Sequence, residues 1–279
     1  MIIDVEQAIQ KHCKKLGLDF KDLDFIGESE TKLSDITLKI IRDEDCESPR
    51  EWDNVGTMVC WHNNYRLGDK QPDVDHESYR TGMVEEFEPG FQDMLERLDA
   101  QWVDFSSEGL DELEALTQKK IESRLEKYFF ILPLYLYDHS GLSISTSRFS
   151  CGWDSGQVGF IYVSKKKARE EYGFKRLTKE RIKKVYAYLE SEVENYDAYL
   201  QGDAYGFIVE SEKTDIEDSC WGFLGPDGEA WAIEAALSNL VADKETRRKT
   251  RFEQIKTWIR NNVPLLNRTA MVSELPALW

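Results

Sequence analysis

The segment YFFILPLYLYD, residues 128–138, constrains the fold more than any other part of this chain. It is too apolar and aromatic for an exposed element, and it is far shorter than the roughly 20 residues of a membrane-spanning helix. A short apolar run of this kind is typical of a buried strand. We therefore predict a central strand that bends at Pro133 and ends in the turn Asp138-His139-Ser140-Gly141.

The segments around this strand have the patterns of further strands and of amphipathic helices. Because strands come in adjacent pairs and helices in blocks, the order favours an α+β fold. We expect a largely antiparallel central sheet with flanking amphipathic helices. The predicted strands lie at residues 36–41, 55–62, 142–147, 157–164, 204–211 and 218–225. The predicted helices lie at 4–16, 84–98 with an interruption at Pro89 and Gly90, 110–128, 164–173 and 178–200. Ser164 and Thr178 are the expected N-caps of the last two helices.

The length of the chain allows one large domain or two small ones. Its 279 residues are 41% hydrophobic and 32% charged, as in an ordinary globular protein. We predict a single α+β domain over residues 1–279 with a helical C-terminal segment at 229–279. Residues 66–82 are rich in turn formers and lack periodicity, so we expect a mobile loop there.

The formal charge of −17 bears on partners and location. Such a charge argues against direct nucleic-acid binding through phosphates, but it permits an acidic surface that competes for a basic partner. The N-terminal residues lack the order of a signal peptide and no apolar run fits a membrane helix, so we expect a cytoplasmic protein. The five cysteines are scattered, which favours reduced thiols over a disulfide framework.

Polar and aromatic side chains gather at the ends of the predicted apolar strands. A ligand pocket requires aromatic walls and a few directional polar groups, although ordinary turns have a similar composition. We predict a recognition site at these strand ends. Its members are Trp52, Asp53, Asn54, His62, Asp138, Trp153, Ser155 and Gln157, with His139, Ser140 and Asp154 beside them.

Cys151 is the best candidate for a catalytic nucleophile. A thiol-dependent hydrolase needs a thiolate beside an imidazole whose ring a third group holds in place. His139 or His62 would supply the imidazole, and Asp154 or Asp138 would orient it. The alternative is a small cysteine packed in a turn, with a histidine that bonds to its own loop.

Two other kinds of site fit the sequence poorly. The run CGWDSG, residues 151–156, is similar to the C-x-x-D-S-G run of trypsin-like serine proteases, but Trp153 replaces the glycine whose N–H lines the oxyanion hole. A zinc site in this chain would lack any C-x-x-C pair, so we predict no metal site. The sequence also has no Gly-rich phosphate-binding loop, so it does not identify a cofactor. The ligands of such a zinc site would be Cys60, His62, His139 and Cys151.

Several blocks of the sequence resemble those of a family of uncharacterised proteins from bacteriophages and other mobile elements. The blocks are ESPREWDNVGTMVCWH (47–62), LYLYDHSG (134–141), WDSGQVGFIYVS (153–164), QGDAYGF (201–207) and DSCWGF (218–223). The resemblance implies an intracellular protein that acts in an infected or plasmid-bearing bacterium. It implies no activity, catalytic residue or cofactor.

We therefore predict an acidic phage-type protein that recognises a host protein or a small ligand through the strand-end cluster. It would act as a counter-defence inhibitor or a mimic of nucleic acid. The alternative is a thiol hydrolase that uses Cys151 with His139 or His62, and a structural or regulatory role is a third hypothesis. A binding protein tolerates the loss of Cys151, whereas the hydrolase needs this thiol next to an imidazole.

Overall fold

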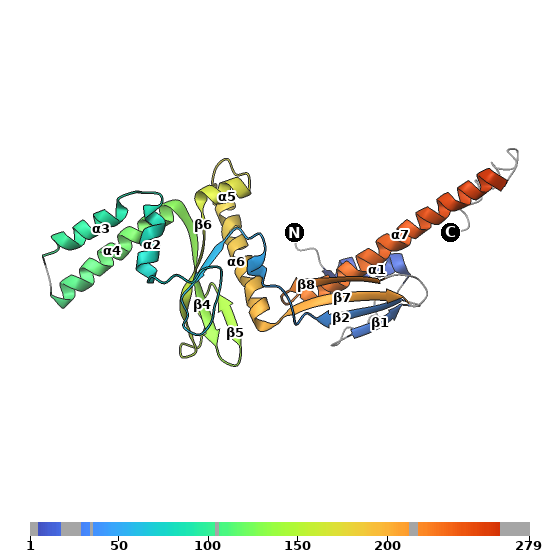
Figure 1. Ribbon diagram of the computed structural model, residues 1–279, viewed down its shortest axis with the longest axis horizontal. Coiled ribbons are helices and arrows are strands. Elements are labelled where there is room, and N and C mark those ends of the chain that lie inside the picture. Colours follow the sequence, from blue (N-terminus) through green and yellow to red (C-terminus); the bar gives the residue numbers. More distant parts are fainter. Residues whose placement is uncertain (1–4, 18–28, 34–35, 104–105, 212–216, 263–279) are drawn as a thin grey trace. The chain divides into compact units, whose positions relative to one another are not determined.

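The computed structural model describes residues 5–17, 29–33, 36–103, 106–211 and 217–262. The described residues form helices and two four-stranded antiparallel sheets, which confirms the α+β class (Figure 1). Two sheets replace the single central sheet that the strand order favours. The chain divides into two compact units: unit 1 is Met1–Asp43 with Ala204–Trp279, and unit 2 is Glu44–Asp203. Whether the two units unfold together, as a single domain would, stays a prediction.

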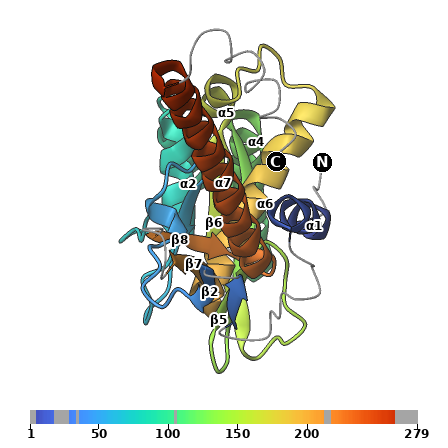
Figure 2. The ribbon, with the colours of Figure 1, turned by 90° about the vertical axis from the view of Figure 1, so that its right-hand side faces the viewer.

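Unit 1 is a sheet that two helices cover on one face. The strand order is β1-β2-β7-β8, and α1 packs against α7 (Figure 2). Alternate side chains of the central strands, Leu38 and Ile40 in β2 and Phe207 and Val209 in β7, enter the apolar core beneath these helices. The elements are α1 (Val5–Leu16), β1 (Ser29–Leu33), β2 (Ile36–Arg42), β7 (Ala204–Ser211), β8 (Glu217–Leu224) and α7 (Gly228–Asn262).

Unit 2 is a sheet with helices on both faces (Figure 1). The strand order is β3-β6-β4-β5, with every pair antiparallel. The strands are β3 (Thr57–Cys60), β4 (Phe129–Asp138), β5 (Leu142–Ser145) and β6 (Ser155–Ser164), and the helices are η2 (Pro49–Glu51), α2 (His76–Glu85), α3 (Phe91–Gln101), α4 (Ser107–Tyr128), α5 (Lys165–Glu171) and α6 (Lys179–Gln201).

The two faces of the unit 2 sheet follow from the alternation of side chains along each strand. Met58 and Ile161 belong to the core that includes α6, whereas their neighbours Val59 and Phe160 belong to the core that includes α2 and α4. Both faces are buried, which explains why the sequence of β4 and β6 is nearly continuously apolar. The predicted buried strand at the centre is confirmed.

Capping residues set the helix boundaries as the sequence predicts. The Ser164 and Thr178 side chains accept from backbone N–H groups at the starts of α5 and α6. Gly202 ends α6 with φ of 72°, a left-handed conformation that glycine adopts without strain. The C-terminal helix is confirmed as one element as far as Asn262, and the remainder of the predicted segment lies outside the described residues.

The local structure departs from the sequence prediction at residues 66–82 and at β1. The predicted loop at 66–82 contains the start of α2, because Asp75 caps the helix by accepting from the Ser78 N–H. The interruption predicted at Pro89 and Gly90 is confirmed, because these residues separate α2 from α3. Strand β1 has the polar sequence SETKL, which carries no apolar alternation and was therefore not predicted. Among the described helices, none is long and apolar enough to cross a membrane.

Candidate functional site

The turn after β4 and the loop before β6 lie together at one end of the unit 2 sheet. The two strands pair antiparallel with Tyr137 opposite Ser155, so the end of β4 meets the beginning of β6. The Asp138 N–H donates to the Asp154 carbonyl at 2.9 Å. The His139 Nδ1 atom lies 3.7 Å from Asp154 Oδ2. The structure therefore brings the predicted residues Asp138, His139, Asp154 and Ser155 together.

The loop before β6 is held by its own hydrogen bonds. The Ser155 hydroxyl donates to the Cys151 carbonyl, and the Cys151 thiol donates to Asp154 Oδ2 at 3.5 Å. Trp153 lies between these bonded residues, and its side chain is 97% exposed. An indole this exposed contributes nothing to the core of the protein, so its large apolar surface is available for contact with another molecule.

The segment after β3 joins the same end of the sheet. The Trp61 N–H donates to the Val158 carbonyl at 2.7 Å, and His62 follows it. His62 Nδ1 accepts from the Asn64 and Tyr65 N–H groups at 3.2 Å, and the His62 ring stacks on Tyr65. The Tyr65 hydroxyl reaches Asp138 Oδ1 at 3.5 Å. His62 is thereby linked to the β4 turn through Tyr65, which the sequence did not single out.

A polar groove lies beside His62. Its aromatic wall is Trp61, whose indole N–H donates to the Val74 carbonyl at 2.7 Å and whose ring stacks on His76 with centroids 3.9 Å apart. Burial, with a smaller contribution from Arg80, lowers the pKa of His76 and favours its neutral form. The groove residues are Cys60, Trp61, His62, Asn63, Asn64, Arg66, Gln71, Pro72 and Asp73.

Three of the predicted site residues lie elsewhere. Trp52, Asp53 and Asn54 precede β3, and the start of β3 lies beside the end of β6 because the strands are antiparallel. Lys167 of α5, which follows β6, donates to the Asn54 carbonyl at 3.2 Å. The prediction that all strand-end residues form one site is therefore wrong for these three. Gln157 lies within β6, where its amide donates to the Gly159 carbonyl at 3.4 Å.

The cluster does not have the arrangement of a thiol-dependent hydrolase. Such an enzyme places an imidazole between the thiol and the carboxylate, so that the imidazole takes the thiol proton. Here Asp154 lies between Cys151 and His139, and its Oδ2 atom is the neighbour of both. The described residues contain no group of three or more His, Cys, Asp or Glu side chains that could hold a metal ion. Burial raises the pKa of Cys60 to about 12, which removes it as a reactive thiol.

An ionic network behind the groove was missed by sequence reasoning. The Arg50 side chain is 5% exposed and donates to Asp69 (2.6 and 2.9 Å), Glu192 (3.0 Å) and the Gly56 carbonyl (2.9 Å). Burial alone would lower the pKa of Arg50, but the two carboxylates together raise it. The partners lie 19 and 142 residues from Arg50 along the chain, so no local spacing identifies them.

The fold and the site define an α+β protein with an exposed aromatic loop and a polar groove at one end of a sheet. No protein-family model, curated protein or solved structure matches the chain. The phage-type family that the sequence blocks resemble therefore stays a prediction.

Proposed function

We propose that this protein binds a partner protein through the end of the unit 2 sheet. The observation that carries the proposal is the 97% exposure of Trp153 on a loop whose neighbours hydrogen-bond to one another. Tryptophan is among the residues that contribute most to the affinity of protein interfaces. We call Trp153 with Tyr65, Asp138, His139 and Asp154 the Trp153 surface.

The surroundings of Trp153 support a binding role. The loop is held by bonds from Cys151, Ser155 and the β4 turn, so little conformational freedom would be lost when a partner binds. Asp154, the chain neighbour of Trp153, and Asp138, in the turn that bonds to Asp154, give the surface two carboxylates, and the chain as a whole is acidic. A partner with an apolar pocket rimmed by Lys and Arg has the matching chemistry. The resemblance to phage proteins favours a bacterial host protein as this partner.

The same geometry favours binding over thiol hydrolysis. Asp154 Oδ2 is the hydrogen-bond acceptor of the Cys151 thiol, so the neighbour of the sulfur is a carboxylate and not an imidazole that could act as a base. The bond from Cys151 instead stabilises the loop that presents Trp153. We therefore assign Cys151 a role in loop conformation.

The proposal is tested by placing a photo-crosslinking benzophenone amino acid at position 153 and, as a matched control, at position 52. Trp52 is also exposed but lies at the opposite end of the same sheet. After irradiation in bacterial lysate, we expect a discrete adduct from position 153 and none from position 52. Excess wild-type protein should abolish the adduct, whereas excess Trp153→Ala protein should not. Identical adducts from the two positions, or equal competition by the two proteins, would contradict the proposal.

Two further variables sharpen the test. If carboxylates contribute to binding, the adduct yield should fall steeply as salt rises from about 0.02 M to about 0.15 M. Cys151→Ser protein should retain most of the adduct, because a hydroxyl can still donate to Asp154. Loss of the adduct in Cys151→Ser, together with fast alkylation of Cys151 in the native protein, would favour the hydrolase instead.

A further inference from the structure

The second half of α7 differs from the first half in burial. The helix is 35 residues long, and its buried residues run from Gly228 to Val241, with Ile259 beyond them. Figure 1 shows that α7 continues past α1 and the sheet of unit 1. Residues 242 to 258 are exposed or half-buried. Because most isolated helices depend on packing for stability, an extension of this length requires another reason for its presence.

The charge of this extension is opposite to that of the whole chain. Residues 244–260, which we call the basic segment, contain seven Lys and Arg against two Glu, in a chain of formal charge −17. Some of these cations have intramolecular roles: Lys244 donates to the carbonyls of Lys15 and Leu16, and Arg247 pairs with Asp243. Arg248 and Lys249 are exposed, and no ion-pair partner is found for them among the described residues.

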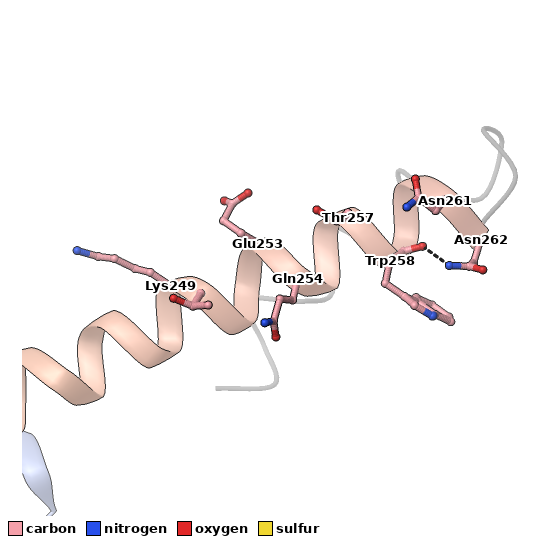
Figure 3. A pocket seen from close by; sticks show the side chains of 8 residues that line it. Lys249, Glu253, Gln254, Thr257, Trp258, Asn261 and Asn262 are labelled. Carbon is pink, nitrogen blue, oxygen red and sulfur yellow. Dashed lines mark hydrogen bonds between the residues drawn. The ribbon is translucent and has the colours of Figure 1, made fainter. Parts of the chain in front are cut away.

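Most of the uncharged side chains that line a hollow on this part of α7 are hydrogen-bonding groups. Figure 3 shows the hollow along this part of the helix, where hydroxyls and amides project beside Lys249 and Trp258. The carboxylate of Glu253 in this hollow is paired with Lys256 at 2.8 Å. The residues of the hollow are Lys249, Thr250, Glu253, Gln254, Thr257, Trp258, Asn261 and Asn262. Lys, Thr, Asn and Gln are side chains that contact phosphate oxygens and base edges in nucleic acids.

We propose that the basic segment of α7 binds the phosphate backbone of a nucleic-acid duplex. A single exposed helix with cations on its sides fits a groove of the duplex, as continuous basic-region helices do. The formal net charge of −17 argues against nucleic-acid binding only if the negative charges are spread evenly over the surface of the protein. At a rise of about 1.5 Å per residue, Asn262 lies about 30 Å along the helix from Val241. That length exceeds the Debye length of about 10 Å at 0.1 M salt, so the carboxylates on the first half of α7, such as Glu229 and Glu234, are largely screened from the far end of the helix.

An anionic membrane is the other polyanion that a basic helix can bind. Membrane binding of such a helix requires an apolar face that can enter the lipid. The apolar stripe of the segment is Phe252, Ile255 and Ile259, of which Ile259 is 5% exposed and the other two are half-buried. Because these three side chains are buried or half-buried, Trp258, which is 58% exposed, is the one large apolar side chain of residues 244–260 that is strongly exposed. A single indole beside exposed cations and amides is a small apolar face, so the structure favours nucleic acid over lipid.

The experiment measures the fluorescence anisotropy of a labelled 30-base-pair DNA duplex against full-length protein over a range of salt. We expect wild-type binding near 0.05 M salt that weakens as salt rises. The double variant Arg248→Gln/Lys249→Gln should bind at least about tenfold more weakly at low salt. Its plot of log Kd against log salt should be shallower by about two, since each phosphate contact contributes about 0.9 to the slope.

The matched control is Lys183→Gln/Lys184→Gln, two exposed lysines of α6 whose loss changes the net charge equally. The control should bind the duplex as the wild type does, and circular dichroism should show that all three proteins have the same helix content. Absence of salt-dependent binding by the wild type would overturn the proposal. Equal weakening in the two variants, or binding to phosphatidylserine vesicles without binding to duplex, would also overturn it.

Discussion

The two units of the molecule stabilise their sheets in different ways. In unit 1, the described core between the sheet and the helices α1 and α7 consists of apolar side chains such as Leu237 and Phe207. Unit 2 also has apolar cores, but it buries an arginine whose guanidinium bonds two carboxylates and a carbonyl. Apolar burial tolerates small adjustments, whereas a buried ion network requires each partner in place. The difference indicates that unit 2 needs a more closely defined geometry than unit 1.

The buried ion network of unit 2 also affects the candidate site, because Asp69 belongs to the same chain segment as the groove residues. Asp69 accepts from Arg50 and from the Met58 N–H at 2.7 Å, and the neighbouring Gly68 N–H donates to the Tyr196 hydroxyl at 3.1 Å. These bonds fix the chain immediately after Tyr65, whose ring contacts His62. The network therefore positions one side of the groove and of the Trp153 surface, although it contacts neither directly.

The largest expected effect is that of Arg50→Met. The substitution leaves Asp69 and Glu192 without their cation, and loss of one partner from a buried ion pair costs about 3–5 kcal/mol in the free energy of unfolding. Urea denaturation followed by hydrogen exchange and mass spectrometry would assign the loss to one unit. We expect faster exchange across unit 2 and unchanged exchange in α1 and β2 of unit 1.

The control for Arg50→Met is Arg247→Met in unit 1. Arg247 makes an exposed helical pair with Asp243, and such pairs contribute less than about 1 kcal/mol. If Arg50→Met instead destabilises both units to the same extent, the chain unfolds as the single domain that its length predicts. The two units would then differ in how their cores are packed but would not differ in when they unfold.

The second prediction concerns the apolar core of unit 1. Leu237 lies in α7 and is fully buried among residues of the sheet and α1. Leu237→Ala leaves a cavity and should lower the free energy of unfolding of unit 1 by about 3 kcal/mol. Calorimetry and hydrogen exchange would measure the change. A matched control is the exposed Leu110→Ala in α4, which should have little effect. Equal decreases in the free energy of unfolding for the two variants would contradict the prediction that the cost depends on the burial of the leucine.

Much of this fold was predictable because the relevant signals are local. Apolar runs predicted β4 and β6, and capping residues predicted the limits of α5 and α6. Strand β1 was missed because edge strands can be polar on both faces. The division into two sheets was missed because it depends on the pairing of β2 with β7, which lie far apart in the sequence.

The candidate site was predictable only in part, for the same physical reason. Asp138, His139 and Asp154 were predicted because polar residues at the ends of apolar strands are visible in the sequence, and the antiparallel pairing of β4 with β6 brings these ends together. Trp52 was wrongly included because residue types alone do not tell which end of an antiparallel strand a loop occupies. Arg50 was missed because a charged residue is usually exposed, and only the folded chain shows its buried partners.

The third prediction compares two glycines that lie in strands of the two units. A Cβ atom on Gly159 of β6 would lie 1.9 Å from the Val59 carbonyl oxygen, whereas one on Gly206 of β7 would lie 2.2 Å from the Trp221 indole. A backbone carbonyl in a paired strand cannot move away, but Trp221 is 45% exposed and can turn outward. Gly159→Ala should therefore cost about 1–3 kcal/mol, and Gly206→Ala less than about 1 kcal/mol.

Thermal unfolding would measure both changes, with Gly152→Ala as the control. A Cβ atom at Gly152 meets nothing within 4 Å, so this variant should unfold as the wild type does. Equal costs at Gly159 and Gly206 would mean that the indole is held as firmly as a strand, and the outer face of the unit 1 sheet would then be more rigid than its exposure indicates.

The smallest expected effect is the pKa of His76, which should lie below its ordinary value of 6.5. Burial against Trp61 and the charge of Arg80 both disfavour the imidazolium, although Asp75 partly opposes them. Because the pKa in the folded state is lowered, the associated stability is present above pH 6.5 and decreases as the pH falls through the folded-state pKa. NMR titration of the His76 ring would measure it, and Arg80→Gln should raise the value. A pKa at or above 6.5 would mean that His76 stacks on Trp61 as a cation, and the aromatic wall of the groove would then gain stability in acid instead of losing it.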